Sequence, residues 1–418
     1  MWSRILGRFL GDVDIAHATV LGTFMGGLAL GARVFGEWSD RLRRPLLVYG
    51  ALEAGIGVYA LLSPHLFPTD ALVGSLGSGA PVERVVYAAA VLLPPTVLMG
   101  GSFPLLTRFL TSRTVDLRRN VGELYAVNTA GSVLGGLFAG FWLLGAMEAP
   151  EALTLMGACN LALGAFVLFT ARGAPARVQS DGPAVPSGFS DAICYGPDAR
   201  RTALWLAGFS GVATMALEVA WTRELAQVLG NTTHGLTLML AALLSGSALG
   251  SVALASRWAG RFALPDLVGG ALLVTSVCLA VTRPLFAAVP LWIGPGGSDV
   301  AIPVYAACFT SLLVPASVAG LIFPAAIRLC AAEQSVGGRV GQIYAVNTLG
   351  TLVGAVFAGL IAVPRLGAPV VFTTVTAAYA LAGLTLAWRG RRIPRPAVGP
   401  LMPVAFPEVE RASEDEAG

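Results

Sequence analysis

The chain has 418 residues, of which 55% are hydrophobic and only 12% are charged, and its mean hydropathy is +0.73. Soluble globular proteins carry about twice that share of charged residues, so the composition excludes an ordinary soluble domain and indicates a protein embedded in lipid. The net charge of +3 is small, and the arginines stand between apolar runs rather than on one basic face, which argues against nucleic-acid binding. We therefore expect lipid as the main partner and no metal or cofactor, since the five cysteines show no ligand spacing.

Eleven segments reach the roughly 20 apolar residues that a helix needs to cross the hydrocarbon core. The predicted spans are 15–36, 45–64, 83–108, 121–145, 150–171, 203–226, 235–256, 265–287, 301–328, 340–363 and 368–388. No small-residue cleavage site follows the first of them, so we expect it to be retained. These runs are too long and too continuous for barrel strands, and they predict an all-α membrane protein.

Arginines cluster in alternate connections between the spans. The clusters lie at 41–44, 108–119, 172–201, 257–261, 328–339 and 389–392. Because positively charged loops stay on the cytoplasmic side, the pattern places these loops and the C-terminus in the cytoplasm, which we take to be that of a bacterium with the protein in its inner membrane.

The sequence repeats itself. Gly122-Glu-Leu-Tyr-Ala-Val-Asn-Thr-Ala-Gly131 returns 219 residues later as Gly341-Gln-Ile-Tyr-Ala-Val-Asn-Thr-Leu-Gly350. Both copies keep the same orientation under the charge rule, so we expect two parallel repeats related by an axis along the membrane normal, as in six-plus-six transporters.

This repeat defines the predicted domains. Residues 1–171 form the first repeat, with five spans and the remnant of a sixth, because Trp2 aligns with Trp221 inside a later span. Residues 201–389 form the second repeat with six spans. The natural protein either lacks the first helix or begins further upstream. The Pro-, Gly- and Ser-rich stretch 172–200 is a predicted cytoplasmic linker, and 390–418 is a predicted disordered tail.

Two carboxylates fall inside apolar spans, where ionised groups are costly and are by default candidates for function. These are Glu53 and Glu218, and Trp221 follows Glu218 by one helical turn. A carboxylate and an aromatic ring on one helix face would suit a cationic ligand or a coupling proton. The alternatives are that each carboxylate is protonated or locks two helices together, or that Arg223 pairs with Glu218.

The repeated motif places the same polar pair in both halves. Tyr125 and Asn128 match Tyr344 and Asn347, and all four are expected to face the bundle interior and to line a binding site. The alternative is polar contact between helices with no ligand.

Glycines and prolines also recur at matched positions. The pairs Gly27/Gly31 and Gly246/Gly250, with Gly131, Gly135, Gly136, Gly140, Gly350 and Gly354, predict close helix packing. The prolines Pro95 and Pro104 in the first half match Pro315 and Pro324 in the second, and they predict a broken or kinked helix in each half. Interrupted helices at corresponding positions indicate a binding site near the membrane midplane.

The loop 36–44 contains Asp40, Arg41 and Arg44. It resembles the loop signature of the major facilitator superfamily, a glycine and an aspartate followed by a basic run, although Arg43 stands where a second glycine is usual. The second half lacks the aspartate and has Ala259 there. The resemblance implies that Asp40, Arg41 and Arg44 form a gating loop; the alternative is a charged loop that only sets topology.

Several motifs taken together resemble the multi-span membrane region that bacteria carry fused to spermidine synthase domains. They are Gly208–Gly211, Leu217–Arg223, Val228–Thr233, Gly246–Gly250 and the twice-repeated Tyr-Ala-Val-Asn-Thr. The resemblance implies a major facilitator-like membrane region that handles polyamines or related amines. No residues match an aminopropyltransferase site, so we expect no enzyme.

Two functions follow as hypotheses. The first is a transporter of a small, cationic metabolite by alternating access, with Glu53, Glu218, Trp221, Asn128 and Asn347 at its site. The second is a membrane scaffold that docks a partner protein at the position of the missing first helix. A polar central cavity would favour transport, and a stoichiometric partner without a cavity would favour the scaffold.

Overall fold

The computed structural model describes residues 13–66, 81–111, 117–173, 196–229, 233–256, 258–293, 301–330 and 336–390. Every regular element in these ranges is a helix, and ten helices are long and apolar enough to cross a membrane. The eleventh predicted span, 121–145, coincides with three helical segments that continue one another from Leu117 to Ala146. The predicted all-α membrane fold is therefore confirmed. The predicted first-helix remnant at 1–12, most of the linker 172–200 and nearly all of the tail 390–418 lie outside the described residues.

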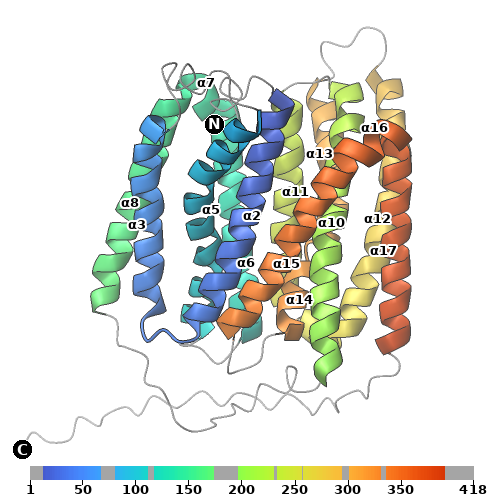
Figure 1. Ribbon diagram of the computed structural model, residues 1–418. Helices are drawn as coiled ribbons and strands as arrows, with labels where there is room; N and C mark the ends of the chain where they lie inside the picture. The colour runs from blue at the N-terminus through green and yellow to red at the C-terminus, as the bar shows by residue number, and fades with distance from the viewer. Residues whose placement is uncertain are drawn as a thin grey trace, which may run out of the picture.

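In the described part of the first repeat, the helices form five units long enough to cross the membrane, which Figure 1 shows side by side. In chain order they are α2 (Val13–Ser39), α3 (Pro45–Leu66), α5 (Pro81–Thr111), α6 (Leu117–Phe138) continued by η1 (Ala139–Leu143) and α7 (Leu144–Ala146), and α8 (Ala149–Arg172).

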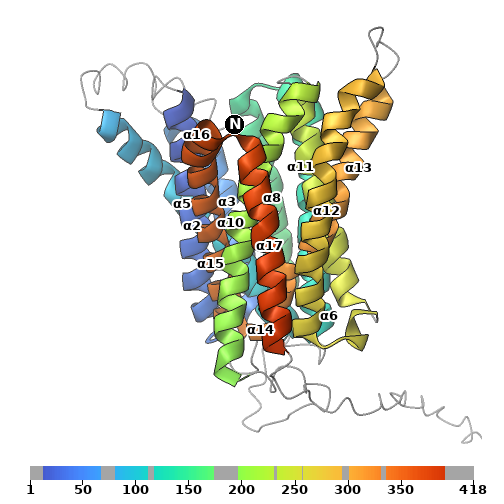
Figure 2. The same ribbon diagram turned by 90° about the vertical axis from the view of Figure 1, so that its right-hand side faces the viewer.

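The second repeat contains six. They are α10 (Gly196–Leu229), α11 (Thr233–Ala255), α12 (Leu264–Ile293), α13 (Ala301–Ala319) with α14 (Ile322–Cys330), α15 (Val336–Val356) continued by η4 (Phe357–Ala362) and α16 (Val363–Leu366), and α17 (Ala368–Gly390). The short η2 (Ala259–Arg261) joins α11 to α12. Figure 2 shows α12 and α17 side by side in front of the second half.

The repeat extends to local backbone geometry. Both η1 and η4 are π-helical, and they occupy matching places in the two copies, 219 residues apart. A π-helical turn inside an α-helix is uncommon and is often found at functional sites. Its presence in both copies indicates that the two halves share an architecture, not only a hydrophobic pattern.

The two halves meet mainly through two helix pairs, α2 with α15 and α6 with α11. In the repeat, α2 corresponds to α11 and α15 corresponds to α6, so each pair becomes the other when the halves are exchanged. This exchange is the signature of a pseudo-twofold axis that runs between the halves, and the space around that axis is where residues of both copies can come together.

Glycines allow the helices of each half to approach closely, as their spacing predicts. A Cβ atom on Gly31 would lie 1.9 Å from the carbonyl oxygen of Val97 in α5, and one on Gly250 would lie 2.2 Å from that of Ser317 in α13. Only glycine permits these contacts, so the predicted packing of Gly27/Gly31 and Gly246/Gly250 is confirmed.

The glycines of the repeated motif behave differently in the two halves. Gly350 and Gly354 pack against carbonyl oxygens of α10. A Cβ on Gly131, Gly135 or Gly136 would meet no atom of the described residues within 4 Å, so the packing prediction finds no support there. The side chain position of Gly140 lies outside the described part.

Of the two matched proline-containing helices, the one in the second half is interrupted in the described residues. α13 ends at Ala319 and α14 begins at Ile322, whereas α5 continues as one helix through Pro94, Pro95 and Pro104. Pro324 lies in the first turn of α14, a position that tolerates proline, but the matched Pro104 lies inside the continuous α5, so proline alone does not explain the break. The first-half prolines therefore do not interrupt α5, and the binding region has to be sought beside α13 and α14.

Candidate functional site

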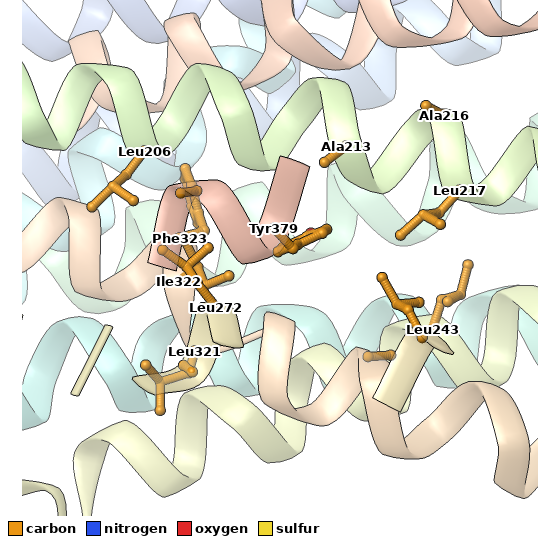
Figure 3. Packing of buried hydrophobic residues seen from close by; sticks show 14 of the residues in the cluster. Leu206, Ala213, Ala216, Leu217, Leu243, Leu272, Leu321, Ile322, Phe323 and Tyr379 are labelled. Atoms are coloured by element: carbon orange, nitrogen blue, oxygen red, sulfur yellow. The ribbon is translucent and has the colours of Figure 1, made fainter. Parts of the chain in front are cut away.

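A cavity of about 120 Å³ lies beside this interruption. Residues of α10, α11, α12, α13, α14, α15 and α17 line it, and Tyr125 of α6 is the lining residue from the first half among those described. Figure 3 shows Leu217 of α10 and Leu243 of α11 pointing into the space between their helices, with Tyr379 of α17 and Phe323 of α14 nearby. The cavity thus belongs mainly to the second repeat and reaches the seam between the two.

The cavity lies at the level of the membrane midplane. Thr214 is the central residue of the span Ala199–Leu229, and Thr275 is the central residue of Leu264–Phe286. Both line the cavity, on helices that cross the membrane separately. This position agrees with the sequence-based expectation of a midplane site beside a broken helix.

Three of the seven predicted binding residues line the cavity: Tyr125, Trp221 and Asn347. The side-chain amide of Asn347 also donates a 3.0 Å hydrogen bond to the carbonyl oxygen of Ala207, which ties α15 to α10. Trp221 packs edge-on against Phe372 with ring centroids 5.8 Å apart and is only 2% exposed. Its ring is therefore held rigidly at the cavity wall.

Glu53 lies elsewhere, between α3 and α5 in the first half. The hydroxyl of Ser102 donates a 2.8 Å hydrogen bond to its Oε1, and the Tyr49 hydroxyl approaches the same carboxyl group. Glu53 is not among the described residues of the cavity wall. Its contacts match the alternative reading, in which the carboxyl group joins two helices.

Glu218 is one position from the cavity residue Leu217 but is not itself in the described lining. Within the described residues no hydrogen bond or ion pair reaches its side chain, and Arg223, the proposed partner, is exposed and unpaired with it. A binding role for this carboxylate stays a prediction.

Tyr344 joins an aromatic cluster built from matched residues of both halves. Phe103 stacks on Tyr344 at 5.6 Å, and Phe323 lies 5.1 Å from Tyr125. Phe103 also meets Tyr125 at 6.1 Å, and Phe323 meets Tyr344 at 6.0 Å. Phe103 corresponds to Phe323 and Tyr125 to Tyr344 in the repeat, so the cluster straddles the pseudo-twofold axis. We call these four residues the aromatic quartet.

The quartet borders the cavity through two of its members. Tyr125 and Phe323 line the cavity and simultaneously belong to the quartet. Asn128, by contrast, is exposed and not part of the described cavity wall. The matched asparagines therefore differ in their surroundings, since only Asn347 has α10 packed against it.

A polar contact joins the halves beyond the quartet. The carboxylate of Asp40 accepts hydrogen bonds from the backbone amides of Gly337 and Gly338, at 2.9 and 2.8 Å, in the first turn of α15. The Nε atom of Arg108 lies 3.4 Å from the same carboxylate. We call this contact the latch and the membrane side on which it lies the latch side.

The latch has a clear physical basis. First-turn amides of a helix lack partners within that helix, and the helix end carries partial positive charge, so a carboxylate there is favourable. Arg41 and Arg44 are exposed on the same loop. A gating role for the three residues stays a prediction, although Asp40 occupies a position from which it can hold the halves together.

Sequence reasoning missed the hydroxyl-bearing residues of the cavity wall, above all Thr275 and Tyr379. The only available signal was a polar atom inside an apolar span. That signal is weak, because most such hydroxyls bond to the carbonyl four residues earlier in their own helix, as Thr348 does to Tyr344 at 2.9 Å.

Several solved structures share this arrangement of helices. A bacterial homologue of the iron transporter ferroportin, in its outward-facing state, has a TM-score of 0.62 at 15% identity, over 93% of this chain and 98% of that one. The chain has the fold of the major facilitator superfamily. The fucose:proton symporter of E. coli gives 0.57 at 13% identity over 93% and 95%, and a proton:xylose symporter of the same superfamily gives 0.59 at 14% over 93% and 90%.

No protein-family model and no curated protein matches the sequence. The likeness to solved structures therefore concerns the fold alone, and the resemblance to the membrane region of fused spermidine synthases stays a prediction.

Proposed function

We propose that this protein is a transporter that moves a small solute across the membrane by alternating access between its two repeats. The observation that carries the proposal is the position of the cavity. The cavity lies at the midplane and touches the seam between the repeats. Along α15, the aromatic quartet comes between the cavity and the latch. A solute site with a closure made from both halves is what rocking of one half against the other requires.

The closure can be undone with few changes. The latch consists of hydrogen bonds and one charged contact, and the quartet consists of aromatic pairs, each worth about 0.5–1.5 kcal/mol. Separating α2 from α15 breaks the hydrogen bonds of the latch. Moving the two repeats apart breaks the aromatic contacts of the quartet. The arginine clusters assign the latch side to the cytoplasm, so the described state would be closed toward the cytoplasm.

The cationic substrate expected from sequence finds little support in the cavity. That expectation depended on Glu53 and Glu218, and neither is in the described lining. Transport of a polyamine or related amine would require Glu218 to turn toward the cavity during the cycle.

The scaffold hypothesis predicted a partner in place of a cavity. A cavity lined in part by unpaired polar groups favours transport instead, because a scaffold has no need to place such groups in its core.

Cysteine labelling tests alternating access without knowledge of the solute. The cavity residue Thr351 is replaced by cysteine in a variant without native cysteines, and a membrane-impermeant maleimide is applied to right-side-out and inside-out vesicles. An Arg44→Cys variant, exposed on the latch side, reports the orientation of each preparation.

We expect Thr351→Cys to react mainly from the side opposite the latch, and to react from the latch side when the latch is weakened. Labelling from one side only, unchanged by every latch variant, would reject the proposal.

A further inference from the structure

We infer that the cavity binds an uncharged solute bearing several hydroxyl groups, of the polyol or monosaccharide class, and that Trp221, Thr275 and Tyr379 provide its polar contacts. The inference deepens the proposed function, on which it rests for the idea that the cavity holds a transported solute.

Three polar atoms in the cavity wall have no hydrogen-bond partner among the residues that the structure describes. They are Nε1 of Trp221, Oγ1 of Thr275 and the hydroxyl of Tyr379, on residues that are 2%, 1% and 0% exposed. Thr214 lies beside the Tyr379 hydroxyl, but no hydrogen bond of ordinary geometry joins them. Buried polar groups are nearly always satisfied, so three orphans in one wall call for an explanation.

The three groups come from three different helices, α10, α12 and α17. The hydroxyl of Thr275 also differs from that of Thr282 on the same helix, which donates a 2.8 Å hydrogen bond to the carbonyl oxygen of Cys278. Polar groups that converge on one space from separate helices, and do not satisfy one another, are arranged for a molecule in that space.

The hydrogen-bonding chemistry of the wall selects the ligand. The indole N–H of Trp221 only donates, so the ligand must offer an acceptor. Asn347 uses one of its two amide hydrogens in the bond to Ala207, and its side-chain oxygen is available as an acceptor, so a donor on the ligand would also find a partner. Threonine and tyrosine hydroxyls do either. A hydroxyl group meets all of these partners, because it both donates and accepts hydrogen bonds.

The charge of the wall excludes ions. No Asp, Glu, Lys, Arg or His is found among the described residues that line the cavity. A cation or an anion at the midplane would lose its hydration without a counter-charge, which is strongly unfavourable. Leu217, Leu243 and Leu279 complete the wall with apolar surface, which suits the C–H groups of a compact polyol.

Binding to the purified full-length protein tests the inference. The neutral probes are glycerol, erythritol, D-xylose, D-glucose and myo-inositol; putrescine and spermidine serve as cations and succinate as an anion. Affinity is measured by isothermal titration, and the thermal unfolding midpoint is followed in parallel. We expect at least one neutral probe to bind and to raise the midpoint, and the charged probes to do neither.

Three variants remove one polar group of the wall each: Thr275→Val and Tyr379→Phe keep the side-chain shape, and Trp221→Phe removes the indole N–H together with part of the ring. Each should weaken binding of the neutral probe about tenfold, because one ligand hydroxyl loses its partner. Without ligand the midpoint of Thr275→Val and of Tyr379→Phe should stay unchanged or rise, since the polar atom lost is unpaired; a merely structural role predicts a fall. Trp221→Phe also leaves a space in the core and should lower the midpoint, so only its effect on binding is used. Tyr305→Phe, at a half-buried tyrosine of α13 outside the described cavity wall, is the control and should leave binding unchanged.

Binding of putrescine, spermidine or succinate but of no neutral probe overturns the inference, as does binding that the three variants leave unaffected or the absence of binding by every neutral probe. Such results would not decide whether the protein works by alternating access, which the cysteine-labelling experiment tests separately. Conversely, one-sided labelling together with neutral-probe binding would reject transport while the site assignment stands.

Discussion

The carboxylate of Asp40, directly after α2, accepts a 2.9 Å hydrogen bond from the backbone amide of Gly337 in the first turn of α15. The two residues belong to different repeats and lie 297 positions apart in the chain. On the same helices, Gly36 and Gly341 bring the two backbones together, since a Cβ on either would overlap the other helix. Close packing therefore positions the α15 terminus within reach of the carboxylate.

The Asp40→Asn substitution should loosen the latch. An amide retains one acceptor oxygen but loses the charge that favours the α15 terminus, a loss of about 1–2 kcal/mol. Labelling of Thr351→Cys from the latch side should then rise about tenfold. The control is Glu37→Gln, which removes an exposed ion pair with Arg33 on α2 and should change labelling little. Equal effects of the two substitutions would contradict a specific role for Asp40.

The Gly341→Ala substitution should separate α2 from α15. The new Cβ would lie 2.2 Å from the carbonyl oxygen of Ala32, and overpacking of this kind costs about 1–3 kcal/mol. We expect a lower thermal unfolding midpoint and greater labelling from the latch side.

Gly270→Ala is the matched control for this change. Gly270 lies within α12, and its new Cβ would meet no described atom within 4 Å, so the substitution should leave the midpoint unchanged or raise it. A similar loss of stability in both alanine variants would show that helix packing at Gly341 is not the cause.

Glu53 should matter for stability rather than for solute binding. Glu53→Leu removes the acceptor for the Ser102 hydroxyl, and Ser102→Ala removes the donor. A double-mutant cycle on thermal or denaturant unfolding should give a coupling of about 1 kcal/mol. Binding of the neutral probe should be unchanged in a folded Glu53→Gln protein, which keeps an acceptor oxygen. Loss of binding in that variant would show that Glu53 contributes to solute binding, contrary to this prediction.

The symmetry of the aromatic quartet predicts equal effects at equivalent positions. Phe103→Ala and Phe323→Ala each remove contacts with the same two tyrosines, Tyr125 and Tyr344. Each variant should lose about 1–3 kcal/mol from two aromatic pairs and should increase latch-side labelling of the cavity cysteine.

An exposed aromatic pair supplies the control for the quartet. Phe262 stacks edge-on with Trp258 outside the membrane core of the bundle, and Phe262→Ala should leave cavity labelling unchanged. A strong effect of Phe323→Ala beside none of Phe103→Ala would argue that the two copies do not close the cavity together.

The local features of this protein were predictable because they depend on hydropathy and repetition. Ten of the eleven predicted spans are found as candidate membrane helices, and the eleventh coincides with α6, η1 and α7. The close packing at Gly31 and Gly250 also follows from spacing alone, since small residues four apart form one face of a helix. In these cases a few neighbouring residues contain all the information that is needed.

The site was less predictable, and Glu53 and Thr275 illustrate why. A carboxylate in an apolar span attracts attention because its burial is costly, but Ser102, 49 positions away, accounts for that burial. Thr275 looks ordinary in sequence, yet its hydroxyl is unpaired at the cavity wall. Whether a polar atom is satisfied depends on its neighbours in space, which spacing along one helix does not specify.

The sequence by itself determined that the chain lies in a membrane, that it is helical, and that it contains two copies of one unit. These properties follow from the cost of leaving backbone groups unpaired in lipid and from direct self-similarity. Only the tertiary structure decided that Phe103, Tyr125, Phe323 and Tyr344 meet at one axis, and that the cavity lies mainly in the second half. Both depend on which helices pack together across the seam, and that choice is made by contacts between residues far apart in the chain.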